Sequence, residues 1–547
     1  MNFADKVIRE YLSDKDWRVN ENSNASFSYP SLLNHLSSTC IAHYTLQSVY
    51  NKEIADAHQN GDIHIHDLGA GIIGYCSGYS LRDLLSMGFT GHGGRASAAP
   101  AKHFDTALGQ ICNFLCTLQT EWSGAQAFSS FDTLLAPFVR YDNLDYKAVK
   151  QNIQQWVFMM NIASRWGQCP FTNITLDWVP PKDLKDQNVI VGGEIKEEKY
   201  NDFQVEMDMI NKAFLEIMLK GDRDGRVFTF PIPTYNITED FTWDNENAKL
   251  LFELTSKYGL PTFQNFIGSD LDPSDTRSLC CRLRLDKRKL ERKVGGLFGA
   301  GELVGSIGVC TINMVRLGYT CNTEEEFFSK LKELMIISKD SLEIKRQECI
   351  KNLEMGLMPY TKVYLNSFKN HFSTLGLIGM NEACLNLFNE NIGSDKGQEF
   401  SIRVLEYMRD LCSEFQEETG NLYNLEATPA EGVCYRLAKI DKEKYPEIIT
   451  AGHGEDIYYT NSTNLPVNYT DDIFEALDLQ EKLQSIYTGG TIFHAFIGER
   501  IESAEQTGQL IKKICELYKI PYITISPTFS ICPVHGYIAG EHHSCPL

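Results

Sequence analysis

The alternation of long helical patterns with short strand-like segments constrains the fold of this 547-residue chain most strongly. Apolar residues recur at helical spacing through residues 31–61, 101–122, 146–166 and 324–356. Segments rich in β-branched and aromatic residues, bounded by glycine, proline or polar residues, occupy 171–178, 226–236, 305–315 and 490–498. Helices interleaved with short buried strands predict an α/β fold with a partly parallel sheet.

Composition argues against several classes of protein. A formal net charge of −21 disfavours attraction to nucleic-acid phosphates, and the basic run at 281–293 is more typical of a solvated loop. No apolar run is long enough to span a bilayer, and the amino-terminal residues do not resemble a signal peptide. Sixteen cysteines without an export signal predict reduced thiols and a cytoplasmic location.

Two cysteine-containing segments are candidates for chemistry. In "NGDIHIHDLGAGIIGYCSGYS", His64 and His66 lie on one face if the segment is extended. This placement suits a hydrogen-bonded wall better than a metal site, for which a third ligand is missing nearby. Cys76 follows among small residues. In "DPSDTRSLCCRLRL", the adjacent Cys280 and Cys281 lack the spacing of a redox pair, and the segment is predicted to be a loop tip.

Three further segments carry polar residues whose roles stay open. Asn313 lies in the apolar strand "GSIGVCTINMV", where either a ligand or a backbone group must satisfy its amide. The turn "TPAEG" at 428–432 leads into a helix, and helix capping explains its Pro429 and Glu431. Near the carboxyl terminus, Cys532, His535 and Cys545 look like three ligands of a four-ligand metal site.

These segments in this order, with "WGQCPFTNITL", "YYTNSTNLPV" and "YTGGTIFHAFIGE", resemble class III ribonucleotide reductase, the anaerobic, glycyl-radical ribonucleoside-triphosphate reductase. The resemblance extends from about Trp17 to the last residue. It implies a ten-stranded α/β barrel of two antiparallel five-stranded parallel halves, with a central finger loop. Residues 1–526 would form the catalytic barrel with its amino-terminal helices, and 527–547 the start of an incomplete zinc-binding module.

The resemblance also implies a reaction, in which ribonucleoside triphosphates are reduced by thiyl radical chemistry with formate as reductant. Cys281 matches the fingertip cysteine that abstracts the ribose 3′ hydrogen, and Cys76 matches the cysteine of the opposite wall that reduces the 2′ carbon. Asn313 and Glu431 would complete the catalytic set. The residues expected to bind substrate are His64, His66, Thr428, Ala430, Tyr459, Asn461 and Ser462.

Regulation and cofactors follow from the same resemblance. Deoxynucleotide effectors would bind along a dimer-interface helix, with Lys102, His103 and Gln110 contributing. A structural zinc ion would use Cys532, Cys545 and one of His535, His542 and His543, with His535 preferred. Because the family's catalytic region would begin almost at Met1, we expect this chain to lack the family's ATP-cone.

The glycyl radical loop of the family lies beyond the zinc module, and no matching pattern occurs before Leu547. We therefore expect a truncated, split or intein-interrupted chain that needs a complementing carboxyl-terminal fragment and a radical-SAM activating enzyme, and that forms a homodimer. Two alternatives remain: another glycyl radical enzyme of the formate-lyase type, or a non-catalytic nucleotide-binding subunit. Effector-dependent binding of ribonucleoside triphosphates would distinguish the first alternative from the reductase.

Overall fold

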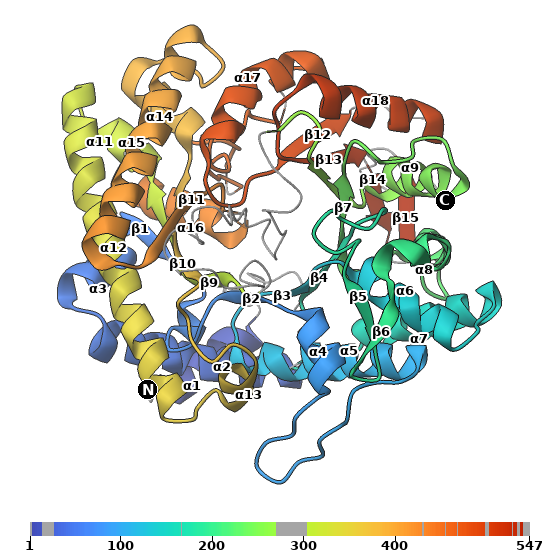
Figure 1. The fold of residues 1–547 in the computed structure, drawn as a ribbon. Coiled ribbons are helices and arrows are strands. Elements are labelled where there is room, and N and C mark those ends of the chain that lie inside the picture. Colours follow the sequence, from blue (N-terminus) through green and yellow to red (C-terminus); the bar gives the residue numbers. More distant parts are fainter. Residues whose placement is uncertain are drawn as a thin grey trace.

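Helices surround a ring of strands in the computed structural model (Figure 1). The structure describes residues 3–13, 27–165, 167–269, 303–428, 431–454, 456–467, 469–497, 503–527, 529–532 and 536–539. The strands of the ring are β2 (Cys76–Tyr79), β3 (Gln126–Phe128), β4 (Thr172–Leu176), β7 (Ile232–Ile237), β8 (Thr262–Asn265), β9 (Gly305–Asn313), β10 (His371–Ile378), β11 (Leu422–Glu426), β12 (Phe493–Ile497) and β13 (Tyr522–Pro527).

The sheet consists of two sets of parallel strands. Its order is β11-β10-β9-β2-β3-β4-β7-β8-β13-β12, and a short strand β1 (Ile63–Ile65) also pairs with β9. Neighbours are parallel from β2 to β8, from β9 to β11, and between β12 and β13. The two sets meet in antiparallel seams at β2/β9 and β8/β13. The predicted α/β fold with ten strands in two opposed halves is confirmed.

Backbone hydrogen bonds also link the two ends of this strand order. The amide nitrogen atoms of Thr488 and Gly489, just before β12, donate to the Leu425 carbonyl oxygen of β11 at 3.1 and 2.7 Å. The Ala427 amide donates to the Gly490 carbonyl oxygen at 2.8 Å. These bonds bring β11 and β12 together, as the circular arrangement in Figure 1 also shows.

The predicted finger loop, with Cys280 and Cys281, falls between β8 and β9 and lies outside the described residues.

Side chains alternate between the outside and the inside of the ring, as expected for strands. Leu375 and Leu377 of β10 pack outward into an apolar core shared with α12 and α15, whereas Thr374 and Gly376 take the opposite face. The helices are α1 (Phe3–Leu12), α2 (Tyr29–Tyr44), α3 (Lys52–Asn60), α4 (Leu81–Met87), α5 (Phe104–Leu118), α6 (Phe131–Tyr141), α7 (Tyr146–Met160), α8 (Gln204–Lys220), α9 (Glu246–Tyr258), α11 (Met314–Thr320), α12 (Glu324–Glu354), α13 (Pro359–Tyr364), α14 (Met380–Phe388), α15 (Asp395–Thr419), α16 (Glu431–Lys444), α17 (Ile473–Ile486) and α18 (Ala504–Leu517).

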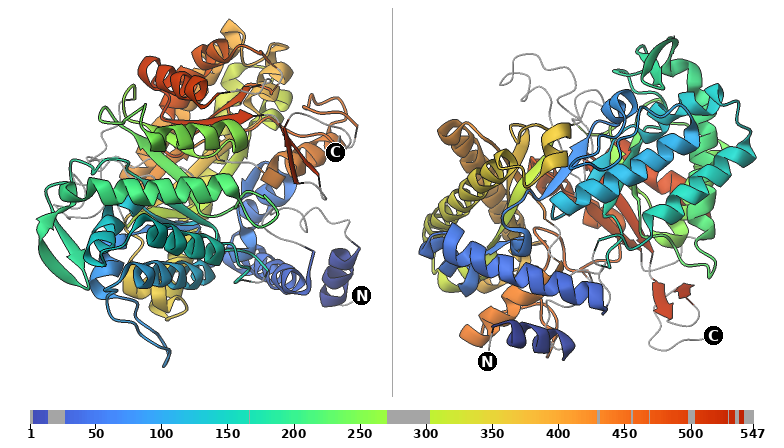
Figure 2. Two further views of the ribbon diagram at one scale, coloured as in Figure 1. Left: turned by 90° about the vertical axis from the view of Figure 1, so that its right-hand side faces the viewer. Right: turned by 90° about the horizontal axis from the view of Figure 1, so that it is seen from below.

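Two small sheets lie apart from the ring. Strands β5 (Asn188–Val191) and β6 (Glu194–Lys199) form one hairpin, and β14 (Phe529–Cys532) and β15 (Gly536–Ala539) form the other. Figure 2 shows the β14–β15 hairpin at the periphery of the molecule. Within the described part of the chain, no helix is both long enough and apolar enough to cross a membrane.

Candidate active site

Cys76 begins β2 at the antiparallel seam between the two halves. It is directly paired with Ser306 of β9, so both side chains lie on the same face of the sheet. The cysteine is 1% exposed and packs with Ala125, Ala127 and Val304 in a small cluster separate from the outer apolar cores. Ser306 Oγ lies 2.9 Å from the hydroxyl oxygen of Thr374 in β10. The seam therefore presents one thiol beside hydroxyl groups of β9 and β10.

The predicted histidine wall forms next to this seam. Strand β1 runs antiparallel to β9 and places His64 opposite Thr311. His66 Nε2 lies 2.7 Å from Thr311 Oγ1, which in turn lies 3.0 Å from Thr428 Oγ1. Gly376 makes room for this contact, because a Cβ there would lie 2.6 Å from Thr428 Oγ1. Three residues proposed from distant segments, His64, His66 and Thr428, are therefore neighbours.

A third histidine and an arginine complete the wall, and neither was singled out from the sequence. The ring centroid of His58 lies 5.3 Å from that of His64, which lies 4.8 Å from that of His66. Arg436 of α16 places Nη1 3.2 Å from His64 Nδ1 and donates from Nη2 to the His58 carbonyl oxygen at 2.6 Å. No pattern in the sequence connects α16 with β1, which explains why Arg436 was missed.

Burial keeps the imidazoles of His58 and His64 neutral. Desolvation, assisted by the charge of Arg436, lowers the pKa of His58 to about 3, and the pKa of His64 also lies well below its ordinary value, mainly because of burial. A guanidinium only donates hydrogen bonds, so His64 Nδ1 accepts from Arg436 and its proton lies on Nε2. Among the described residues, no group of three or more His, Cys, Asp or Glu side chains is arranged to hold a metal ion.

Asn313 ends β9 and makes its hydrogen bonds within the protein. Its Nδ2 donates to the Gly61 carbonyl oxygen at 2.9 Å and to Asp441 Oδ2 at 2.7 Å, while Oδ1 accepts from the Arg316 amide at the start of α11. Tyr459 donates to the same carboxylate, at 2.8 Å from Oδ2. Both residues are almost fully buried. These contacts fit residues that fix the carboxyl edge of the sheet better than residues that face a substrate.

The segment containing Asn461 and Ser462 is fastened to the carboxyl end of β10. Asn461 forms a bridge with Ile378, and the Ser462 carbonyl oxygen accepts from the Met380 amide at 3.1 Å. Ser462 has a φ of 46° and is fully buried. The carboxyl ends of β9, β10 and β11 thus bring Asn313, this segment and Thr428 to one edge.

The remaining predicted catalytic and substrate-binding residues lie wholly or partly outside the described residues. Cys281 and Ala430 lie in segments that the structure does not describe, and Glu431 is placed only as the first backbone position of α16. For these residues, the roles implied by the sequence stay predictions.

The three effector candidates lie at the start of α5, where that helix approaches the β5–β6 hairpin. His103 Nδ1 lies 2.8 Å from Asp142 Oδ1, and Lys102 is exposed beside Gly192 of the hairpin turn. Gln110 donates from Nε2 to the Ala99 carbonyl oxygen at 2.6 Å, and its buried Oε1 has no hydrogen-bond partner among the described residues. The structure therefore brings Lys102 and His103 together at the surface, with Gln110 buried two turns further along the helix.

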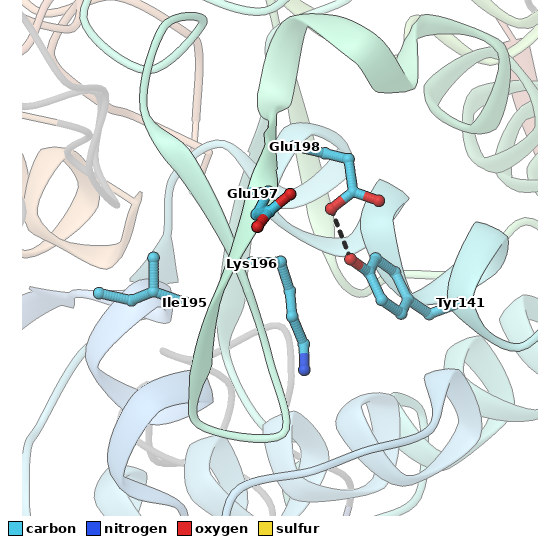
Figure 3. A pocket seen from close by; sticks show the side chains of 5 residues that line it. All are labelled: Tyr141, Ile195, Lys196, Glu197 and Glu198. Carbon is cyan, nitrogen blue, oxygen red and sulfur yellow. Dashed lines mark hydrogen bonds between the residues drawn. The ribbon is translucent and has the colours of Figure 1, made fainter.

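An open pocket of about 530 Å³ lies between the end of α6 and strand β6 (Figure 3). The residues around it are Tyr141, Ile195, Lys196, Glu197 and Glu198. Tyr141 donates its hydroxyl hydrogen to Glu198 Oε2 at 2.7 Å. Lys196 is itself ion-paired with Glu194. Two carboxylates with one neutralised lysine disfavour a phosphate group, so we do not assign the effector phosphates to this pocket.

Comparison with known proteins decides the family. The family described as "Anaerobic ribonucleoside-triphosphate reductase" matches residues 21–547. This chain belongs to that family. The anaerobic ribonucleoside-triphosphate reductase of Haemophilus influenzae is 22% identical over 526 residues, covering 87% of this chain and 69% of the relative. The enzyme of the same name from Enterobacteria phage T4 is 25% identical, covering 87% and 80%.

The solved anaerobic ribonucleotide reductase of Thermotoga maritima, in complex with dATP and CTP, has the same fold. Its TM-score is 0.76 at 20% identity, covering 98% of this chain and 92% of that one. Of the zinc ligands predicted for this anaerobic reductase, the structure describes only the backbone of Cys532. Cys532 ends β14, with its side chain undescribed, whereas His535, His542, His543 and Cys545 lie outside the described residues.

Proposed function

We propose that this chain reduces ribonucleoside triphosphates to deoxyribonucleoside triphosphates by thiyl radical chemistry. The observation that carries the proposal is the buried thiol of Cys76 at the seam of the two half-barrels, beside neutral histidines and hydroxyl groups. The names of the relatives point to the same reaction. A radical on sulfur must be kept from water and oxygen, and a thiol that is 1% exposed meets this need.

Each residue then has a distinct task. A thiyl radical on Cys281 abstracts the 3′ hydrogen of the ribose, and Cys76 supplies a hydrogen that reduces the 2′ carbon. His64 is neutral, so it exchanges hydrogen bonds with sugar hydroxyl groups without adding charge, and His66 offers Nε2 beside Thr311. Thr428 extends this polar wall toward the start of α16, where Glu431 would transfer protons and Ala430 would contact the substrate. Asn313, Tyr459, Asn461 and Ser462 hold the edge in place.

Effector binding at α5 belongs to the same proposal. The Thermotoga maritima protein holds dATP and CTP according to its description. In this chain, Lys102 offers positive charge and His103 offers hydrogen bonds for a phosphate, and the Gln110 oxygen, which has no partner within the described part of the chain, accepts from a base or a sugar. We further propose a homodimer, a structural zinc ion at Cys532, His535 and Cys545, and formate as the reductant. The radical would come from a glycyl radical made by a radical-SAM activating enzyme.

The sharpest test replaces the two cysteines separately in the activated enzyme. Cys281→Ala and Cys76→Ala should each abolish formation of deoxynucleotides, whereas the affinity for CTP should change by less than about twofold, because neither thiol holds the phosphates. Cys310→Ala is a matched control, since Cys310 of β9 is equally buried but faces α12, where its Sγ lies 3.3 Å from Ser338 Oγ. It should retain turnover.

The outcomes separate the alternatives. Turnover that survives Cys281→Ala would remove the radical role of that residue. Effector-dependent CTP binding without any turnover by the activated wild type would favour a non-catalytic nucleotide-binding subunit. Absence of CTP binding would favour a different glycyl radical enzyme. Formate as reductant requires one labelled carbon dioxide released from labelled formate for each deoxynucleotide formed.

A further inference from the structure

Two cysteines one turn apart in α5 have no part in the reaction proposed above. Cys112 is 8% exposed and Cys116 is half-buried, and their sulfur atoms are 3.9 Å apart, within hydrogen-bonding contact for thiols. Residues four apart share a helix face, so the helix itself holds this pair together. The arrangement is a preformed dithiol.

The surroundings of Cys116 favour its thiolate. The hydrogen bond from Cys112 is the main cause that lowers the pKa of Cys116 to about 7, and a hydrogen bond from Ser164 adds to it. Ser164 Oγ already accepts from Gln119 Nε2 at 2.8 Å, which leaves its own hydrogen for the sulfur. By contrast, burial raises the pKa of the Cys349 thiol to about 12. Cys116 is therefore the more nucleophilic thiol at neutral pH.

We propose that Cys112 and Cys116 form a redox-modification site for low-molecular-weight disulfides. The Cys116 thiolate attacks one sulfur of the small disulfide, forming a mixed disulfide and releasing one small thiolate. The Cys112 thiol then loses its proton and attacks the Cys116 sulfur, which closes a Cys112–Cys116 disulfide and releases the second small thiol. The two protein thiols lose two electrons, and the small disulfide gains them.

Closing this bond distorts α5. Side chains four apart on a helix have Cβ atoms about 5–6 Å apart, whereas a disulfide needs about 3.5–4.5 Å. The turn between the cysteines must tighten, so the bond is expected to be easily reduced. Phe114 lies in that turn and packs edge-on against Tyr79 of β2, with ring centroids 4.9 Å apart. Formation of the disulfide is therefore expected to move Phe114 and, through its contact with Tyr79, to affect β2, the strand that begins at Cys76.

Cys169 is the competing partner for Cys116. It follows α7 in the chain and is half-buried, and the charge of Cys116 contributes to raising its pKa, after burial. A test of the proposal must therefore show which thiol resolves the mixed disulfide.

The experiment treats the full chain with glutathione disulfide under anoxic conditions, blocks the remaining thiols and maps the peptides by mass spectrometry. The wild type should yield a linked Cys112–Cys116 peptide that dithiothreitol releases. Cys112→Ala should instead keep a glutathione adduct on Cys116, and Cys116→Ser should lose both products at this site. Cys169→Ser should behave like the wild type. A linked Cys116–Cys169 peptide in the wild type would overturn the assigned pairing.

A second measurement compares the labelling rates of two thiols within the wild-type protein. In the wild type at pH 7, brief treatment with iodoacetamide should label Cys116 severalfold faster than the exposed Cys40, because the thiolate is the reactive form and the surroundings of Cys116 favour it. In Cys112→Ala this advantage should disappear. Equal labelling of Cys116 and Cys40 in the wild type would contradict the proposal, as would the absence of any glutathione product at Cys116.

Discussion

Lys345 of α12 is buried in a way that disfavours its charge. It is 1% exposed, and its Nζ makes no hydrogen bond with any residue that the structure describes. Burial is the main cause that lowers the pKa of its amine below the ordinary value. The side chain crosses β9 at Gly308, where a Cβ would lie 2.8 Å from Lys345 Cδ. An unsatisfied amine at this depth costs free energy of folding.

Lys345→Met should therefore raise the free energy of unfolding at pH 7 by about 1–3 kcal/mol. The unfolded lysine binds a proton more readily than the folded one, so wild-type stability rises with pH across the window between the two pKa values. The advantage of the variant should shrink as the pH approaches 10.5, the ordinary lysine value. Urea unfolding at several pH values measures both effects.

Lys339→Met on the same helix is the matched control. Lys339 is nearly as buried, but its Nζ lies 2.7 Å from Glu418 Oε1. Because Glu418 is well exposed, losing this pair should lower stability by less than about 1 kcal/mol. A destabilised Lys345→Met protein would show that the amine has a stabilising role that its contacts do not explain.

Residue types could be predicted from the sequence more readily than residue partners. The placement of His64 and His66 on one face followed from the strand period, and the structure places them together. The pairing of Cys76 with Ser306 depends on the register between strands about 230 residues apart, which no local pattern encodes. For Asn313 the sequence left a ligand and a backbone contact equally open, and the structure shows protein partners.

At the scale of elements, the junction between β10 and α14 depends on one glycine. Gly379 has a φ of 76° and precedes the first residue of α14, and a Cβ there would lie 2.1 Å from Val315 Cγ2 of α11. Its amide donates to the Thr460 carbonyl oxygen at 2.8 Å, which connects the junction to the segment before Asn461 and Ser462. A side chain at this position would therefore disturb α11 and the candidate site together.

Gly379→Ala should destabilise the protein by more than about 3 kcal/mol, because overpacking adds to the cost of the left-handed backbone. Gly356→Ala is the control, since Gly356 has a φ of 83° and open space around it. The Gly356→Ala substitution should lower the free energy of unfolding by only about 1 kcal/mol. Equal losses for the two variants, measured by thermal unfolding, would mean that Val315 moves aside without penalty.

Long elements were predictable, and short ones were not. The helical pattern of 324–356 corresponds to α12 at Glu324–Glu354, and the strand pattern of 305–315 corresponds to β9. The helical pattern of 31–61 corresponds to two α-helices, α2 and α3. It divides at Tyr50, which is extended with a ψ of 152°, and Asn51 then caps α3 by accepting from the Ile54 amide. Strands such as β1 and β3 have three residues each, too few for a periodic signal.

At the scale of the whole molecule, the two halves are joined by short seams. Only two residue pairs join β8 to β13, and Asn265 reinforces this contact. Its Nδ2 donates to the carbonyl oxygen atoms of Tyr518 and Ile520, both at 3.1 Å, and its Oδ1 accepts from the amides of Ile267 and Gly268. The side chain is fully buried, so water cannot replace these bonds.

Asn265→Ala should lower the free energy of unfolding by more than about 2 kcal/mol, because it leaves buried backbone groups without partners. Hydrogen exchange should accelerate in β13 more than in β4, which lies inside one half. Asn188→Ala is the control. Asn188 also donates to a backbone carbonyl oxygen, that of Lys196, but it lies in the separate β5–β6 hairpin. The Asn188→Ala substitution should therefore lower the free energy of unfolding by less than about 1 kcal/mol. Uniform exchange after Asn265→Ala would argue against a local opening of the seam.

The opposed strand directions also determine how the ring is entered. In a barrel of uniformly parallel strands, every carboxyl end opens at one mouth, and the chemistry collects there. Here each mouth receives the carboxyl ends of one half and the amino ends of the other. Both mouths therefore combine carboxyl and amino strand ends, so the polar groups that follow the strands are divided between the two openings instead of being concentrated at one.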